Sequence, residues 1–275
     1  MPGSPNFAHA VVVDPNGTNA NADFTSINQA IPEARDRRPT SGRATVVVNP
    51  GIYQENVLLG ADDHRIDLVG VDRDACIIAP STGVGLTIES GIVSPRDHMI
   101  QGLTILTGDT PAASHGIEIK QGSGGSVPKG ITIKDCKVSA PGTQACGILA
   151  ADADDLMIDG CTVQSPNFKA MRFGRATIML HSSFVGLVGV ESVASANQPD
   201  GVRAVGCLFD GTSKGLFLVG SPAENIEVRE CTIRSKQIPL HTDTLKGSVL
   251  FVNNLIELDG EADSEGALCD PSRHQ

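Results

Sequence analysis

Apolar and polar residues alternate in short segments that recur along the chain at a nearly constant spacing. Each segment ends in a small polar residue or a cysteine, and another apolar residue follows two positions later. Alternation with a period of two residues predicts β-strands. The recurring small residue is found at Cys136, Cys161, Ser183, Cys207, Cys231 and Asn254, in steps of 25, 22, 24, 24 and 23 residues.

This repeat length matches one coil of a β-solenoid, in which each coil packs only on its neighbours. Every coil also carries a second short apolar segment, as at residues 116–119 and 147–150, and glycines mark the turns between segments. The predicted fold class is therefore all-β, a right-handed parallel β-helix. We expect a single domain over residues 1–275, with coils over 44–258 and a polar tail over 259–275.

The first coil of a solenoid needs a cover, and residues 23–40 are predicted to supply an N-terminal capping helix. Asp23 is the predicted N-cap of this helix, and Pro32 is predicted to kink or end it. The apolar residues that share one helical face are Phe24, Ile27, Ile31 and Ala34.

Four cysteines occupy the same position in different coils, which predicts an inward stack of buried thiols. A buried free cysteine behaves as a small apolar residue. The chain has seven cysteines, an odd number, and no CxxC pair, so we expect neither a disulfide framework nor a cysteine metal site. The stacked residues are Cys136, Cys161, Cys207 and Cys231.

The charge and composition of the chain argue against some classes of binding partner. The formal net charge of −11 argues against nucleic acid and against an anionic membrane surface. No apolar run approaches ~18 residues, and no signal peptide is recognisable, so we expect no membrane segment and leave the compartment open. Aromatic residues make up 3% of the chain, with one Tyr and no Trp, so few rings are available to stack on sugars.

The first 80 residues resemble the opening of the pectinesterases. The resemblance rests on residues 23–31, 46–57, 66–71 and 76–78, and above all on the element Gly51-x-Tyr53-x-Glu55. It implies a β-helix of the pectin-lyase-like superfamily, in which this element has a structural role.

The same resemblance implies an Asp nucleophile, a second Asp as general acid and base, an orienting Arg and Gln side chains for the oxyanion. The corresponding positions here are Ala170, Ala145, Ser221 and His115-Gly116. An ester hydrolase without these groups loses most of its transition-state stabilisation. The resemblance therefore implies a pectinesterase-like β-helix whose pectinesterase catalytic residues are replaced.

A different enzyme is the main alternative, either a polysaccharide lyase or a glycoside hydrolase. Its site would be assembled from the charged residues of the second strand column and the following turn, where an ion pair between Asp152 and Arg175 is expected. Glu191 is predicted three coils away from Glu118, in the next outward row. At the spacing of stacked strands the two carboxylates would be ~14 Å apart, which is too far for the catalytic pair of a glycoside hydrolase. The candidate catalytic residues are Asp152, Arg172, Arg175, Glu118 and Lys120.

The sequence predicts no confident metal site and no cofactor. Asp152, Asp154 and Asp155 form the tightest acidic cluster and are weak candidates for metal ligands. Ca²⁺ is expected only if the lyase alternative holds, and no other cofactor is predicted. The histidines His115, His181 and His241 are interpreted as surface residues.

The leading hypothesis is a non-catalytic β-helix protein with a binding or structural role, for which carbohydrate is one candidate ligand. A virion or spike-type structural protein is a further alternative. Apolar residues predicted on outer faces favour a homo-oligomer, with a trimer as one arrangement. These residues are Leu149, Phe217 and Val219; Met157, Met179, Leu250 and Val252; and Phe184, Leu208 and Leu255.

Overall fold

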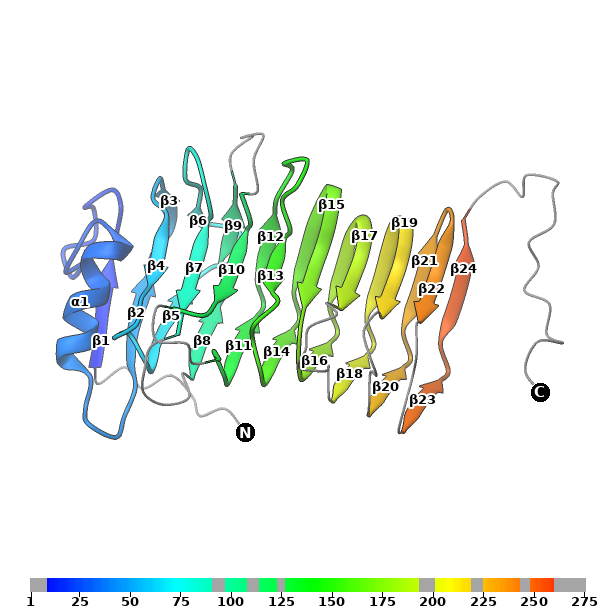
Figure 1. The fold of residues 1–275 in the computed structure, drawn as a ribbon. Coiled ribbons are helices and arrows are strands. Elements are labelled where there is room, and N and C mark those ends of the chain that lie inside the picture. Colours follow the sequence, from blue (N-terminus) through cyan, green and yellow to red (C-terminus); the bar gives the residue numbers. More distant parts are fainter. Residues whose placement is uncertain are drawn as a thin grey trace, which may run out of the picture.

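The protein is a parallel β-helix, as predicted (Figure 1). The computed structural model describes residues 9–90, 97–107, 114–122, 127–192, 201–218, 225–242 and 248–259. Its strands form three columns, which we name A, B and C, and all strand pairs within them are parallel. Column A is a ten-stranded sheet, and columns B and C together form a fourteen-stranded sheet.

Column A contains β1 (Ala10–Val13), β2 (Ala44–Val48), β5 (Ile66–Gly70), β8 (His98–Gln101), β11 (Ile131–Lys134), β14 (Leu156–Asp159), β16 (Thr177–Leu180), β18 (Val202–Val205), β20 (Ile226–Arg229) and β23 (Val249–Val252). Column B contains β3 (Gly51–Tyr53), β6 (Cys76–Ile78), β9 (Thr104–Leu106), β12 (Lys137–Ser139), β21 (Thr232–Ser235) and β24 (Leu255–Leu258). Column C contains β4 (Val57–Leu59), β7 (Leu86–Glu89), β10 (Ile117–Lys120), β13 (Ile148–Ala150) and β22 (Ile238–Thr242). Three longer strands pass through both B and C: β15 (Thr162–Phe173), β17 (Ser183–Ser192) and β19 (Leu208–Leu218).

The core is a stack of aliphatic rows, because inward residues of successive coils pair in register. In column B the inward row is almost fully buried from Tyr53 to Ile233. Phe184 and Phe209 belong to this row, and their rings stack at 5.6 Å between centroids. The predicted outward position of Phe184 is therefore wrong.

The turn between columns A and B repeats one backbone geometry. Its first residue takes a positive φ in seven coils, and φ there ranges from 47° to 65°. The next residue points inward, and Cys136, Cys161, Cys207 and Cys231 at this position are at most 2% exposed, so the predicted thiol stack is confirmed. The first turn residues are Gly102, Asp135, Gly160, His181, Gly206, Glu230 and Asn253.

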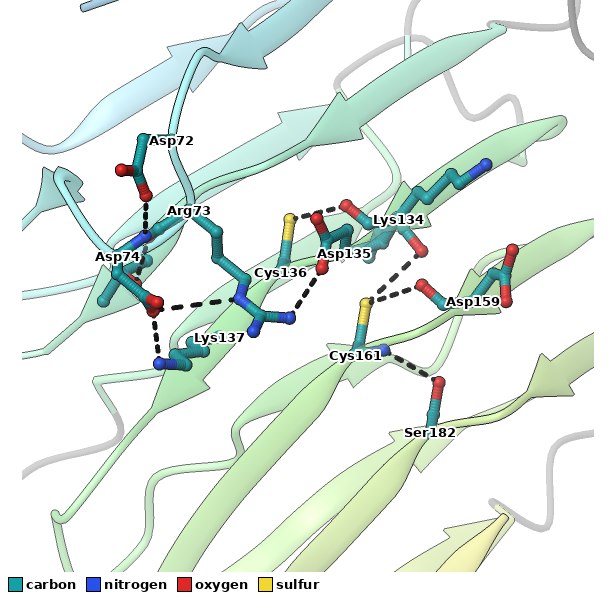
Figure 2. A network of polar contacts seen from close by, with 12 residues as sticks. Asp72, Arg73, Asp74, Lys134, Asp135, Cys136, Lys137, Asp159, Cys161 and Ser182 are labelled. Carbon is teal, nitrogen blue, oxygen red and sulfur yellow. Dashed lines mark hydrogen bonds and ion pairs between the residues drawn. The ribbon is translucent and has the colours of Figure 1, made fainter. Parts of the chain in front are cut away.

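Polar side chains fill the gaps in this stack by binding the backbone of the neighbouring coil. The amide of Cys161 donates a hydrogen bond to Ser182 Oγ at 3.1 Å, and the amide of Cys231 donates to Asn254 Oδ1 at 2.9 Å. Figure 2 shows Ser182 beside Cys161. Ser182, not Ser183, therefore occupies the cysteine position, and the predicted alignment of this coil was wrong by one residue.

The N-terminal cap is the helix α1 (Ile27–Arg37), which buries Ile27, Ala30, Ile31 and Ala34 over the first coil. Its N-cap is Ser26, whose side chain accepts a hydrogen bond from the Gln29 amide. The predicted N-cap was Asp23, which instead binds the Val12 amide and Arg37. The helix also runs through Pro32 rather than ending there.

The Gly51-x-Tyr53-x-Glu55 element holds the cap and the first coil together, as the resemblance implied. Tyr53 is 2% exposed and its hydroxyl donates to the carbonyl oxygens of Val13 and Asn49. The Glu55 carboxylate accepts hydrogen bonds from Ser26 Oγ, Ile27 N and Asn28 N at 2.7, 2.7 and 3.1 Å. A carboxylate at this end of a helix satisfies free amides and opposes the helix dipole.

The two ends of the described solenoid differ (Figure 1). Strand β1 pairs with β2, so the solenoid begins before residue 44, earlier than predicted. At the other end, Ile256 lies in the inward row of column B but is 50% exposed, because β24 pairs only with β21. Residues 260–275 of the predicted tail lie outside the described residues. In the described part of the chain, no helix has the length and apolarity required to cross a membrane.

Candidate functional site on the outer face of column C

The outer face of column C is the first candidate, because the resemblance to pectinesterases places catalytic residues there. Residue pairing defines one outward row that crosses eight strands. Glu191 pairs with Arg172 and lies in the same row as Glu118, whereas it was predicted in the following row. The row is Leu58, Thr87, Glu118, Leu149, Arg172, Glu191, Phe217 and His241.

A register shift explains this error. In β17 the pairing with β19 shifts between Gly186 and Val188, and in β15 the pairing with β17 shifts between Ser165 and Lys169. Such irregularities change which residues face outward beyond the turn. The sequence could not reveal them, because the turns between columns B and C differ in length from coil to coil.

The charged groups on this face are paired with one another. Lys169 Nζ lies 2.6 Å from Glu191 Oε1, and their side chains are 16% and 11% exposed. Arg172 Nε lies 3.6 Å from the same oxygen. On the preceding coils, Lys120 Nζ lies 3.1 Å from Glu118 and 3.4 Å from Glu89. Every carboxylate on the described part of this face therefore has a cationic partner.

His115 and Cys146 lie at the edge of the face, and both are buried. The Cys146 amide donates to His115 Nδ1 at 3.0 Å, so this ring nitrogen carries no proton. Burial lowers the pKa of His115 and raises the pKa of the Cys146 thiol to about 11. The surface interpretation of His115 was wrong. Both groups are held neutral at neutral pH, which suits a structural role better than a nucleophile.

The positions matched to pectinesterase catalytic residues are closely packed. Ala170 is fully buried and Ala145 is 1% exposed, while Ser221 lies outside the described residues. One coil before Ala170, a Cβ added to Gly147 would lie 2.6 Å from the Ala170 carbonyl oxygen. A carboxylate side chain has no room at residue 147 without moving the backbone.

The acidic cluster predicted for the lyase alternative lies in the turn between β13 and β14. Asp154 pairs with Lys129 at 2.9 Å, and Asp155 adopts a φ of 52° in the turn. Among the described residues, no ion pair joins Asp152 to Arg175 or Arg172, so the predicted Asp152–Arg175 pair is wrong. The described residues also contain no group of three metal-binding side chains.

The apolar outer rows are smaller than predicted. Met179 is buried in the core together with Phe184, and Val219 lies outside the described residues. Phe217 is half-buried between His241, at 4.7 Å between ring centroids, and Lys214, whose Nζ lies over the Phe217 ring. Apolar exposure remains substantial at Leu250 and Leu255, which are 39% and 53% exposed.

A second candidate, missed by the sequence analysis, is a groove of about 410 Å³ on the outer face of column B. It spans β9, β12 and the start of β15. Its lining comes from separate strands of three successive coils, so the sequence contains no motif that predicts it. The groove is lined by Thr104, Leu106, Lys137, Val138, Ser139, Thr162 and Gln164.

Comparisons with known proteins bear on the fold. No protein-family model and no curated protein matches the chain. Among solved structures, Escherichia coli YbhC matches with a TM-score of 0.57 at 11% identity, over 93% of this chain and 86% of that one. Carrot pectin methylesterase matches with a TM-score of 0.48 at 11% identity, over 94% and 84%. The A-module of the Azotobacter vinelandii mannuronan C-5 epimerase AlgE4 matches with 0.47 at 13% identity, over 89% and 76%. At 11% identity the match to YbhC speaks for the fold alone, and it agrees with the parallel β-helix described above.

Proposed function

We propose that the protein is a non-catalytic β-helix with a binding or structural role, and not a functional pectinesterase. The observation that supports this proposal is the ion pairing on the column C face. Glu191 is engaged by Lys169 and Arg172, and Glu118 by Lys120. Glu191 is only 11% exposed between these two cations, and this favours a structural ion pair over a carboxylate that reaches substrate.

Spacing supports the same conclusion. Glu118 and Glu191 are three pairing steps apart in one row, through Leu149 and Arg172. Strands spaced ~4.8 Å apart give a separation of ~14 Å. Retaining glycosidases place their carboxyl groups ~5–5.5 Å apart and inverting ones ~6.5–9.5 Å apart. The two glutamates therefore do not form a glycosidase pair, and no observation favours the lyase, hydrolase or virion alternatives over the proposal.

The test is a set of three turnover assays on the unmodified chain at high protein concentration. Methanol release from methyl-esterified pectin reports ester hydrolysis, new ultraviolet absorbance on polygalacturonate reports lyase activity, and new reducing ends report hydrolysis. We expect all three signals to equal a blank without protein, while a pectin methylesterase serves as the positive control for methanol.

Turnover in any assay would overturn the proposal, provided that it scales with protein concentration. The variants Glu191→Gln and Asp152→Asn would then locate the site. Loss of turnover in Glu191→Gln would assign catalysis to the column C face, and loss in Asp152→Asn would assign it to the acidic turn of the lyase alternative.

A further inference from the structure

The groove on column B has a definite geometry. Two outward rows border it, and each row takes one residue from each of three adjacent coils. The first row is Thr104, Lys137 and Thr162. The second row is Leu106, Ser139 and Gln164. The groove therefore runs along the axis of the solenoid, across the strands, with chemically similar positions repeated at the ~4.8 Å spacing of the coils.

A turn from an earlier coil contacts residues of the first row (Figure 2). Arg73 in this turn binds Asp135 with an Nη1–Oδ1 distance of 2.6 Å, and its carbonyl oxygen accepts a hydrogen bond from Thr104 Oγ1 at 2.7 Å. Asp74 in the same turn pairs with Lys137. These contacts hold the turn against the first row and neutralise Lys137, the single charged residue of the lining.

Three polar side chains of the groove make no hydrogen bond to any described residue. In the part of the chain that the structure describes, neither the hydroxyls of Ser139 and Thr162 nor the amide of Gln164 makes a side-chain hydrogen bond. Ser139 and Thr162 are half-buried and Gln164 is exposed. Leu106, 36% exposed, adds an apolar surface beside them. Neutral donors and acceptors next to an apolar patch match the hydroxyl and C–H surfaces of a sugar ring.

Other ligand classes fit poorly. Nucleic acid and other polyanions need unpaired Lys or Arg, whereas the one lysine here is paired and the chain carries a net charge of −11. An extended peptide binds by adding to a free strand edge, and β9, β12 and β15 are already paired on both sides. A purely apolar ligand would leave the three polar side chains unsatisfied.

We propose that the column B groove binds a neutral oligosaccharide along the solenoid axis. This inference rests on the proposed function only in taking the protein to be a binding module, and it assigns the ligand to a face other than the pectinesterase-like one. The groove volume of about 410 Å³ lies within the range of ligand sites, ~300–1,000 Å³.

Calorimetric titration tests the proposal with defined hexasaccharides as probes: the β-1,4-linked oligomers of glucose, xylose, mannose and galactose, and hexagalacturonate as the charged control. We expect at least one neutral hexasaccharide to bind more tightly than hexagalacturonate. The double variant Thr162→Val with Gln164→Leu should weaken that binding about tenfold or more, because two side chains that hydrogen-bond the sugar are lost.

Matched controls separate the groove from the rest of the surface. Thr232 lies in the same outward row as Thr162 but outside the groove, so Thr232→Val should leave the affinity unchanged. Circular dichroism of each variant checks that the fold is intact.

The proposal is overturned if no neutral hexasaccharide binds at millimolar concentration, if hexagalacturonate binds best, or if the double variant binds as well as the unmodified chain. It is also overturned if Arg172→Leu on column C, and not the double variant, abolishes binding. Turnover of pectin would overturn the proposed function and leave this comparison of affinities intact.

Discussion

Replacing Glu55 with alanine removes the carboxylate that fastens the capping helix to the first coil. This carboxylate accepts three hydrogen bonds, one from a hydroxyl and two from amides at the start of α1. The helix in turn buries four apolar residues over the end of the solenoid. Loss of Glu55 should therefore destabilise the end of the core as well as the helix.

The magnitude follows from the contacts. A hydrogen bond to a charged group contributes ~1.5–3 kcal/mol, and the favourable position of an anion at a helix N-terminus adds ~0.3–1 kcal/mol. The three bonds share one carboxylate and Ser26 still caps the Gln29 amide, so their contributions are not additive. We expect Glu55→Ala to lower the free energy of unfolding by about 2–4 kcal/mol, and Glu55→Gln by about half of that.

Urea denaturation followed by circular dichroism measures this change, and native-state hydrogen exchange locates it. Amides of β1 and β2 should lose protection before those of β16 or β18, because solenoid coils are stabilised mainly by their immediate neighbours. The control is Glu33→Gln, which removes an exposed ion pair to Arg37 and should cost no more than ~0.5 kcal/mol. If Glu55→Ala costs no more than this control, the fastening role assigned to Glu55 is refuted.

Three further predictions concern other parts of the molecule. No more than one of the seven thiols should react with a thiol reagent in the native state, because six are buried, and rapid native labelling of several would contradict the described packing. Burial lowers the pKa of His115, so on acidification the unfolded chain takes up the proton before the folded chain does. The stability that the neutral ring provides should therefore be complete above about pH 6.5 and decline as pH falls. His115→Gln should flatten this decline, as measured by urea titrations at about pH 7.5 and about pH 5.5. Light scattering coupled to size exclusion should give the mass of a homo-oligomer, because Leu250 and Leu255 are exposed apolar residues, whereas a monomer mass at micromolar concentration would exclude self-association. Phe217→Asp should weaken assembly if the column C face takes part in it.

The solenoid could be predicted from the sequence because the residues that repeat are the buried ones. Inward aliphatic residues and the cysteine position recur once per coil, and both are required by packing. The prediction failed where two adjacent residues were chemically alike. Ser182 and Ser183 cannot be distinguished by composition, and the choice depends on the positive φ of His181 and on the bond from the Cys161 amide to Ser182 Oγ.

The candidate sites were less predictable, because they depend on contacts between coils. The sequence identified Glu118, Lys120 and Arg172 as charged outward residues but not their pairing. The register shift between β15 and β17 decides that Glu191 lies next to Arg172. The predicted ion pair between Asp152 and Arg175 was wrong for a related reason, because the sequence does not show how side chains in neighbouring turns are oriented. The column B groove had no sequence signal at all, since ordinary Thr, Ser and Gln residues line it.

The repeated turn between columns A and B has a consequence for how this molecule can be shortened or lengthened. Cys207 and Cys231 occupy equivalent corners, and Phe209 is followed by Ile233 in the same inward row. Removing residues 207–230 would bring one equivalent corner onto another, so every remaining strand would keep its inward and outward faces. Removing a single residue from a strand would exchange those faces and expose the core of that coil. The length of the rod is therefore adjustable in whole coils, ~4.8 Å at a time.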